Sequence, residues 1–463
     1  MPNQSDRPIK LAVIGHTNVG KTSLMRTLLR NEDFGEVKNA SATTRHVEMA
    51  TLHTQDGIPL VALYDTPGLE DGSGVMDFIV EHTDGRADGI DRLRAFLEAV
   101  SNQSNLLDGD YSQEAKVINA LLSSQVALYV IDTREPISSK YKDELAILAS
   151  SGIPILPVFN FIKDKNTQFE AWKDMLSRRA LHVYNLFDTI AFDFDSEMAL
   201  WENLGTMTHH QAFDQLKDER TKLWQQMVET GSVMIADFLI NVASFQKKIG
   251  EHDDPEPVLN AMQHTTHQAF NILQDRLLEL YKFYHTPLQQ DELIIHGSEQ
   301  DMFDGEFLAR YGIRTAGGSI AGIVIGASID VATLGASLGL GTAIGSVVGG
   351  LLPNSTTIKD KALGVKTLNI SDDTLLVLAT KSQALHHTLR HLGHANLNQI
   401  NISHQDHLVW QPSKLPAPLK KARTYPNYCG LDESYDAKKH LRLALANELS
   451  ETLLEHLLQP KSI

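Results

Sequence analysis

The stretch GHTNVGKTS, residues Gly15–Ser23, decides the fold of this 463-residue chain. It follows an apolar run, Ile9–Ile14, and it leads directly into a helical pattern at Lys21–Arg30. Its spacing is G-x-x-x-x-G-K-[ST], in which the glycines allow backbone N–H groups to curl around a phosphate without a Cβ in the way. A strand, a glycine-rich loop and a helix in this order predict a phosphate-binding P-loop.

Two side chains of this stretch carry the chemistry that a nucleotide requires. Lys21 can reach the β- and γ-phosphates with its ammonium group, and the hydroxyl of Thr22 can bind Mg²⁺. The helix that starts near Lys21 adds the positive end of its dipole. The residues that the motif assigns to nucleotide binding are Gly15, His16, Thr17, Asn18, Val19, Gly20, Lys21, Thr22 and Ser23.

A second motif, Asp65-Thr66-Pro67-Gly68, ends the apolar run Leu60–Tyr64. An acidic side chain at this place can hold Mg²⁺ through water, and the Gly68 N–H can sense a γ-phosphate. Between the two motifs, Thr44 lies on a loop that can close over Mg²⁺ and open after hydrolysis. Three elements in this order predict a GTP-hydrolysing switch rather than a generic ATPase.

These motifs resemble the Era branch of the TrmE–Era–EngA–septin GTPases over roughly residues 9–200, through Thr43-Thr44-Arg45-His46 and Asp65-Thr66-Pro67-Gly68-Leu69. The resemblance implies GTP and GDP as ligands, Mg²⁺ as the cofactor, and pairing of two GTPase domains. It also implies catalytic roles for Lys21, Thr44 and Gly68, and Mg²⁺ ligation by Thr22, Thr44 and Asp65.

The chain beyond residue 200 does not resemble the RNA-binding domain of Era, because it lacks a G-x-x-G loop with basic flanks. The ribosomal role of Era is therefore not expected here. The whole arrangement is instead similar to poorly characterised bacterial GTPases with a C-terminal domain of unknown function.

The motif that would read the guanine base departs from the family pattern. The family has N-K-x-D after the fifth strand, whereas this chain has Asn160-Phe161-Ile162-Lys163-Asp164. Asn160 fits, but Lys163 stands where a carboxylate should accept two base N–H groups, and Asp164 comes one residue late. Either the loop bulges and brings Asp164 to the base, or base selectivity is weak. The region expected to close the base site, Asp193–Glu197, also lacks the usual Ser-Ala pair.

The residue after the second motif is Leu69, which cannot orient an attacking water as the Gln of Ras-like enzymes does. The resemblance offers Asn18 instead, because an Asn at this P-loop position helps several relatives to bind K⁺ beside the phosphates. A fixed cation there would stabilise the charge that develops on the phosphate oxygens. The alternative is that Asn18 only stabilises the turn of the loop.

Short β-like runs alternate with helical patterns over the first 200 residues, which predicts an α/β P-loop GTPase domain with a mostly parallel sheet and helices on both faces. A helical insertion near 69–124 is expected to hold one helix around Ile90–Val100 and another near Gln113–Leu122, either functional or a packed decoration. From about Gln211 the strand pattern stops, and a mainly helical C-terminal region is expected. The expected strands are Lys10–Gly15, Val47–His53, Pro59–Asp65, Gln125–Asp132, Ile153–Phe159 and Thr189–Phe194.

The changes of pattern divide the chain into four parts. These are a P-loop domain at 1–205, a helical region at 206–312, a Gly-rich apolar helical hairpin at 313–353 and a C-terminal α or α+β region at 354–463. The third part is unusual, because Ala316–Leu352 holds one charged residue, Asp330. Glycines recur there every four residues, a spacing that lets helices approach closely, and Val331–Leu352 is long enough to span a bilayer. Three interpretations stay open: a buried hairpin, a flexible linker, and the membrane-associated hairpin that we favour.

Composition sets the remaining expectations. The formal net charge of −17 argues against broad binding to nucleic acid, which needs clustered Lys and Arg. The single cysteine, Cys429, excludes an internal disulfide and fits a reducing compartment. No apolar leader precedes residue 11. We therefore expect a cytoplasmic protein, held peripherally or integrally at the inner face of the membrane where the Gly-rich segment meets it.

Overall fold

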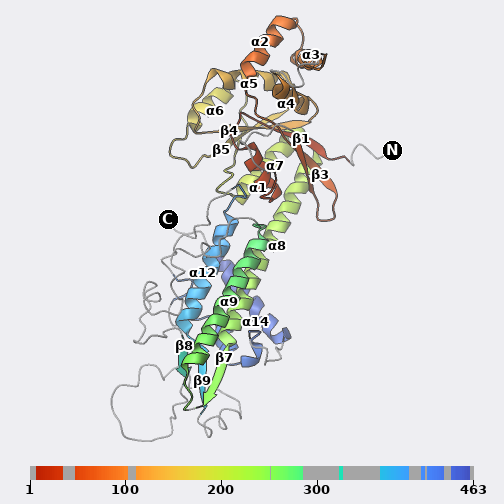
Figure 1. Ribbon diagram of the computed structural model, residues 1–463. Helices are drawn as coiled ribbons and strands as arrows, with labels where there is room; N and C mark the ends of the chain where they lie inside the picture. The colour runs from red at the N-terminus through yellow and green to blue at the C-terminus, as the bar shows by residue number, and fades with distance from the viewer. Residues whose placement is uncertain are drawn as a thin grey trace. The chain divides into compact units, whose positions relative to one another are not determined.

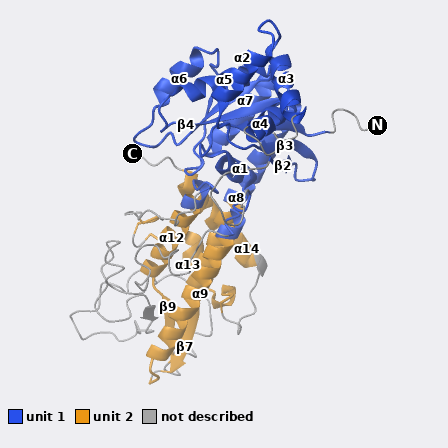
Figure 2. Ribbon diagram, turned by 45° about the horizontal axis from the view of Figure 1, so that its top comes forward, with its two compact units in different colours: residues 1–228, 278–289, 388–400 blue, residues 229–277, 290–387, 401–463 orange. Residues whose placement is uncertain are grey.

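The computed structural model describes residues 7–34, 47–102, 111–250, 252–284, 323–326, 365–395, 408–411, 414–431 and 439–458. The chain divides into two compact units, and each unit is built from three stretches of sequence (Figure 2). Unit 1 takes residues 1–228, 278–289 and 388–400, and unit 2 takes residues 229–277, 290–387 and 401–463. The unit that holds the P-loop therefore includes two short stretches from the C-terminal half.

A six-stranded sheet forms the centre of unit 1 (Figure 1). Its strand order is β2-β3-β1-β4-β5-β6. All neighbouring strands pair in parallel except β2, which runs antiparallel to β3 at one edge. The predicted α/β domain with a mostly parallel sheet is confirmed. The strands are β1 Ile9–Ile14, β2 Glu48–His53, β3 Pro59–Asp65, β4 Val126–Asp132, β5 Ile155–Asn160 and β6 Asn185–Leu186.

Helices bury the centre of this sheet on both faces. All residues of β4 are buried, as expected for a strand between two layers. On one face, Tyr129 and Ile131 join the hydrophobic cluster made with α2–α6, and the alternate residues Leu128 and Val130 are buried on the other. The helices of this part are α1 Lys21–Leu29, α2 Gly72–His82, α3 Gly89–Asn102, α4 Ser112–Leu122, α5 Ser139–Ser150, α6 Phe169–Ser177 and α7 Phe194–Thr208.

The described part of the insertion between β3 and β4 holds three helices, whereas two are expected from the sequence. The missed helix is α2, which begins in a Gly/Asp-rich stretch typical of a loop. Asp71 is the N-cap of α2, and its Oδ1 accepts from the Gly74 N–H at 2.8 Å. The same residues that suggest a turn therefore start a helix.

Unit 2 contains a three-stranded antiparallel sheet with the order β7-β9-β8. β7 Gln246–Gly250 and β8 Ile323–Gly326 both pair with β9 Val365–Ile370. The expectation that strands stop after Gln211 is therefore wrong, and so is a helical hairpin at β8. The β-branched run Ile-Val-Ile suits a pleated strand once β9 supplies a partner for its backbone. The rest of the predicted hairpin, including all of Val331–Leu352, lies outside the described residues.

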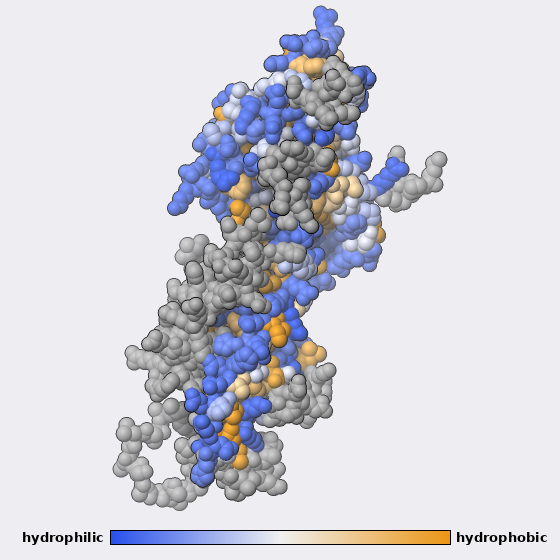
Figure 3. Space-filling view, viewed as in Figure 1, coloured by the Kyte–Doolittle hydropathy of each residue, from blue (hydrophilic) through white to orange (hydrophobic). Residues whose placement is uncertain are grey.

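Long helices make up most of the remaining described chain, which confirms a mainly helical C-terminal region. Of the described helices, α8 alone is long and apolar enough to cross a membrane by composition, and 72% of its apolar window is buried within the structure. Hydrophilic residues dominate the visible surface of unit 1, with smaller hydrophobic spots between them (Figure 3). The helical elements after α7 in the described chain are α8 Gln211–Ser244, α9 Glu256–Leu280, α12 Asp372–Arg390, α13 Ala417–Arg423, the 3-10 turn Pro426–Tyr428 and α14 Lys439–Leu458.

Candidate nucleotide-binding site

The P-loop lies between the end of β1 and the start of α1, and its packing requires glycine at two places. Gly20 has a φ of 98° at the N-cap of α1, and a Cβ there would lie 2.4 Å from Nδ2 of Asn160. A Cβ at Gly15 would lie 2.5 Å from the carbonyl oxygen of Val130. Asn18 is exposed and takes a left-handed φ of 64°, which Asn tolerates better than most residues. Both glycines of the motif are thus fixed by close contacts.

Lys21 is buried in the first turn of α1, and the loop itself holds its ammonium group. Nζ donates to the carbonyl oxygens of Gly15 at 3.0 Å and His16 at 2.7 Å. Burial lowers the pKa of Lys21 to about 8, although nearby carboxylates, Asp65 first among them, act in the opposite direction. A phosphate oxygen would offer this cation a stronger partner than two neutral carbonyls, so the position suits an anion.

Thr22 and Asp65 form the pair that the sequence assigned to Mg²⁺. The Thr22 hydroxyl donates to Oδ2 of Asp65 at 2.6 Å. Asp65 is fully buried, and its Oδ1 has no hydrogen-bond partner among the described residues. Burial raises the pKa of Asp65 to about 6, against the opposing effects of the Thr22 hydroxyl and the Lys21 ammonium group. A buried carboxylate oxygen without a donor, beside a hydroxyl, fits a hard cation that prefers oxygen ligands.

The main chain at Gly68 lies directly on the P-loop. A Cβ at Gly68 would lie 2.1 Å from Oγ1 of Thr17 and 2.7 Å from its backbone nitrogen. The Thr17 hydroxyl donates to Oε1 of Glu70 at 2.8 Å. The side chain of Leu69 packs in the hydrophobic core, so it cannot meet a water at the phosphates. Sequence reasoning did not single out Glu70, whose carboxylate also acts on the pKa of Lys21.

Behind the loop, His16 connects the P-loop to α5. Its Nδ1 lies 2.8 Å from Oε1 of Glu144, and its Nε2 lies 3.0 Å from Nζ of Lys140. Because an ammonium group can only donate, Nε2 accepts and the ring proton sits on Nδ1. Glu144 is buried and also accepts from the Tyr129 hydroxyl at 2.8 Å. Sequence reasoning missed Glu144, although its position on the buried face of α5, three residues after Tyr141, was an available signal.

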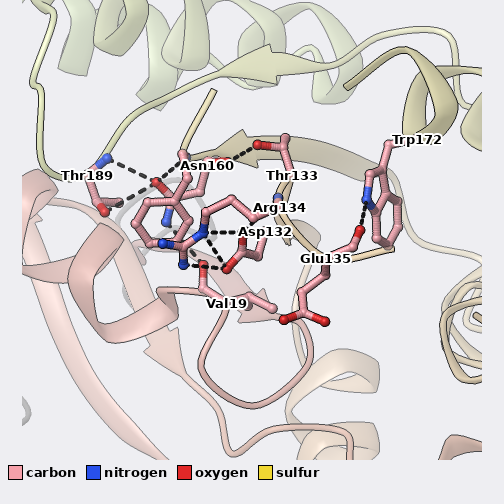
Figure 4. Close-up of polar contacts among 9 residues, drawn as sticks. Val19, Asp132, Thr133, Arg134, Glu135, Asn160, Trp172 and Thr189 are labelled. Carbon is pink, nitrogen blue, oxygen red and sulfur yellow. Dashed lines mark hydrogen bonds and ion pairs between the residues drawn. The ribbon is translucent and has the colours of Figure 1, made fainter. Parts of the chain in front are cut away.

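Asn160 ends β5 and joins three parts of the fold through one buried amide (Figure 4). Its Nδ2 donates to the carbonyl oxygen of Val19 in the P-loop at 3.0 Å. Its Oδ1 accepts from the backbone N–H of Thr189 at 3.1 Å and from the Thr189 hydroxyl at 3.2 Å. The candidate base site is therefore built by the P-loop, the end of β5 and the loop after β6.

The loop that meets Asn160 is 188–191, and the expectation of Asp193–Glu197 at this place is wrong. Asp193 instead caps α7 and accepts from the Ser196 N–H. The predicted strand Thr189–Phe194 is also wrong, because Oδ1 of Asp188 accepts from the N–H groups of Ile190 and Ala191 and turns the chain. The parallel partner of β5 is the short strand β6.

The turn after β5 carries the displaced carboxylate. The Asp164 N–H donates to the carbonyl oxygen of Phe161 at 3.1 Å, and Oδ1 of Asp164 accepts from the Asn166 N–H at 2.8 Å. The Arg134 guanidinium lies 3.8 Å from the centre of the Phe161 ring. It makes three hydrogen bonds to the Asp132 carboxylate (Figure 4). Asp164 thus caps its own turn, and both alternatives for base selectivity stay open.

Thr44 lies outside the described residues, so its predicted role stays a prediction. The potassium role of Asn18 is equally untested, and its left-handed backbone suits the alternative of a turn former as well. Val19 is buried, and Ser23 is half-buried in α1. The predicted residues that the structure brings together around the loop are Gly15, His16, Thr17, Gly20, Lys21, Thr22, Asp65, Gly68 and Asn160.

The sheet, the P-loop and the Thr22–Asp65 pair define a P-loop nucleotide-binding protein of the GTPase type. In agreement, residues 10–161 match the model of the 50S ribosome-binding GTPase family. Residues 173–451 match a domain of unknown function, DUF3482. Because this second match spans more than half of the chain, the protein belongs to the DUF3482 family.

Individual relatives are similar over the GTPase part. GTPase Der of Herpetosiphon aurantiacus is 29% identical over 192 residues, which are 40% of this chain and 39% of the relative. The tRNA modification GTPase MnmE of Acholeplasma laidlawii is 28% identical over 172 residues, 34% of this chain and 36% of the relative. The chain thus spans less than two fifths of the length of these two relatives.

Solved structures of Era are also similar to part of the chain. Era of Aquifex aeolicus bound to GDP and aluminium fluoride is 16% identical, covers 43% of this chain and 56% of its own, and has a TM-score of 0.29. A structure of Era with MgGDPNP and 16S ribosomal RNA is 15% identical, covers 44% of this chain and 57% of its own, and has a TM-score of 0.30.

Proposed function

We propose that this protein binds GTP and hydrolyses its β–γ phosphoanhydride with water, as a Mg²⁺-dependent conformational switch. The observation that carries the proposal is the hydrogen bond from Thr22 to the buried Asp65, beside Lys21. Lys21 would bind the β- and γ-phosphates, while Thr22, Asp65 and, in the triphosphate state, Thr44 would hold the metal ion. The metal ion supplies charge neutralisation at the phosphate oxygens.

The contact between Gly68 and Thr17 supports a switch. The Gly68 main chain rests on the backbone of Thr17, and the hydrogen bond from Thr17 to Glu70 fixes the following residues to the same loop. An anion that reorganises the P-loop must therefore move residues 68–70 as well, because they pack directly against Thr17 of the loop. Nucleotide state would be transmitted first to the residues after β3.

Release of phosphate under multiple-turnover conditions tests the proposal. We expect turnover of GTP that needs Mg²⁺, that is lost in Lys21→Ala with the fold intact, and that rises when K⁺ replaces Na⁺. Equal rates of wild type and Asn18→Ala in both salts would contradict the potassium role. Tight GTP binding without turnover would instead support a different function, that of a nucleotide-sensing membrane or scaffold protein with negligible turnover. Light scattering with GTP and GDP would test pairing of two GTPase domains.

We also propose that the switch acts at the inner face of a membrane, through residues 316–352. The support comes from composition, since Val331–Leu352 has no charged residue over a length that can enter hydrocarbon. Flotation of the purified protein with liposomes, with and without GTP, tests this. Protein that stays soluble in every condition would contradict the membrane proposal and leave the GTPase proposal untouched.

A further inference from the structure

A short segment from the C-terminal half packs against the candidate base site within unit 1. Gly393, just beyond α12, donates its N–H to the carbonyl oxygen of Ile190 at 2.9 Å. A Cβ at Gly393 would lie 2.0 Å from the carbonyl oxygen of Thr189 and 3.2 Å from that of Ile190. The position is buried. Any side chain here would therefore push directly on the backbone of the loop that meets Asn160.

That loop holds the Asn160 amide, which the proposed function places at the base. Thr189 donates both its N–H and its hydroxyl to Oδ1 of Asn160, and Asn160 donates to Val19 in the P-loop. The carbonyl oxygen of Thr189 also accepts from the Thr27 hydroxyl of α1 at 3.2 Å. One continuous set of contacts thus runs from Gly393 through Thr189 and Asn160 to the P-loop.

The segment around Gly393 is itself fixed. Nε2 of the neighbouring His394 lies 3.0 Å from the carbonyl oxygen of Tyr281, and the His394 ring stacks on Phe283 with 4.4 Å between centroids. The Tyr284 N–H in turn donates to Oε2 of Glu32, just after α1, at 2.7 Å. His394 therefore fixes Gly393 to the segment 281–284, and that segment is itself bonded to Glu32 next to α1.

We infer that Gly393 is a positioning residue for nucleotide-base recognition, so that the DUF3482 domain completes the base site of its own GTPase domain. The match to the GTPase family ends at residue 161, while Thr189 and Gly393 both lie within the 173–451 match. The inference rests on the proposed function. It assigns to this family domain a direct part in holding the nucleotide: it orders the loop that orients Asn160.

The test separates recognition of the nucleotide base from binding of the phosphates. Binding of GTP, GDP and inorganic tripolyphosphate is measured by calorimetry for wild type, Gly393→Ala and the control Gly85→Ala, whose added Cβ meets no atom within 4 Å. We expect Gly393→Ala to lose about tenfold or more in affinity for GTP and GDP, equivalent to about 1.4 kcal/mol. Its affinity for tripolyphosphate, which has no base, should equal that of wild type, and Gly85→Ala should bind all three ligands normally.

Hydrogen–deuterium exchange of the wild type keeps the inference testable if Gly393→Ala does not fold. GTP should slow exchange in peptides covering 188–191 and 388–395 as well as the P-loop, whereas tripolyphosphate should protect the P-loop alone. GTP protection that leaves 388–395 unchanged, or equal GTP affinity of folded Gly393→Ala and wild type, would overturn the inference alone. A wild type that binds neither GTP nor tripolyphosphate would overturn the proposed function as well.

Discussion

Lys21 is a cation that the fold buries before any anion is bound. Its pKa is lowered from 10.5 to about 8, so a bound phosphate, which raises that pKa again, makes nucleotide binding take up a proton above about pH 8. We expect affinity for GTP to stay constant between about pH 7 and about pH 8 and to fall by up to about tenfold per unit above that range. Calorimetry between about pH 7 and about pH 9, in buffers of different ionisation enthalpy, measures both effects.

The control for this prediction is Lys21→Arg, because a guanidinium does not titrate in that range. An affinity of the wild type that is independent of pH, without proton uptake, would contradict the interpretation of Lys21 as the phosphate-binding cation.

Asp65 is a carboxylate in a buried position that disfavours its negative charge. Its folded-state pKa of about 6 lies above the ordinary 3.8, so the folded state binds more protons between these values and its stability falls as pH rises through them. The cost above about pH 6 is on the order of 3 kcal/mol. Without metal or nucleotide, Asp65→Asn should therefore unfold at a higher temperature than wild type at pH 7, and at a similar temperature near pH 4.

The same substitution should abolish the Mg²⁺-supported turnover, since an amide oxygen carries no charge for the metal. Thermal unfolding followed by circular dichroism and phosphate release with varied Mg²⁺ are the two measurements. A less stable Asp65→Asn protein at pH 7 would show that the carboxylate is well satisfied within the fold.

Glu70 is the acidic side chain that follows Leu69 and contacts Thr17. Glu70→Gln keeps an oxygen that can accept from the Thr17 hydroxyl and removes only the charge. We expect kcat for GTP to fall by about tenfold or more with little change in KM, because a carboxylate can orient the attacking water where Leu69 cannot. Tighter nucleotide binding with unchanged kcat would mean instead that Glu70 merely repels the phosphates.

Among single residues, the sequence predicted the P-loop glycines, Lys21, Thr22 and Asp65, because each belongs to a motif of fixed spacing. It did not predict their distant partners. Glu144 meets His16 across 128 residues of sequence, and no local pattern encodes such a distance. Thr189 was assigned to a strand because its neighbours Ile190 and Phe192 are apolar, while the turn depends on one side chain, Asp188.

The turn after β5 is the element that bears on base selectivity. Because the Asp164 carboxylate caps the Asn166 N–H, Asp164→Asn should preserve the turn and change the GTP affinity by less than about threefold. The ratio of GTP to ATP affinity should also stay nearly the same. Competition titrations with both nucleotides measure this, and Asp132→Asn, which breaks the charged pair with Arg134, is a comparison at the neighbouring strand end. A collapse of the GTP preference in Asp164→Asn would show that the carboxylate leaves its cap to read the base.

Among elements, the central strands could be predicted because burial on both faces makes them continuous apolar runs. The helices α1, α4 and α5 could be predicted because burial of one face repeats apolar residues at helical spacing. The elements that could not be predicted depend on capping or pairing. α2 starts at an Asp/Gly stretch whose meaning changes once Asp71 caps it, and β8 is a strand only because β9 pairs with it.

For the whole molecule, unit 1 takes structural support from beyond the expected boundary at residue 205. The Arg30 guanidinium, at the end of α1, pairs with the buried Glu197 at 3.1 Å and lies 4.9 Å from the ring centre of Trp224 in α8. A fragment ending at 205 would expose this buried pair to water on the side that Trp224 covers. We therefore expect the fragment 1–205 to unfold at a lower temperature than the full chain and to bind GTP at least about tenfold more weakly.

Side-by-side thermal unfolding and GTP titration of the fragment and the full chain measure this. A fragment as stable and as tightly binding as the full chain would establish 1–205 as an independent domain.

The pairing of β8 with β9 limits how many times the charge-poor stretch between them can cross a bilayer. Gly326 pairs with Thr367 in one antiparallel ladder, so the chain leaves this sheet and returns to it at adjacent positions. Residues 327–364 begin and end at this one sheet, so both ends lie on the same side of any bilayer. The stretch therefore crosses a bilayer an even number of times or not at all. Whichever way this stretch meets lipid, both of its ends therefore stay on the side of the bilayer that holds this sheet.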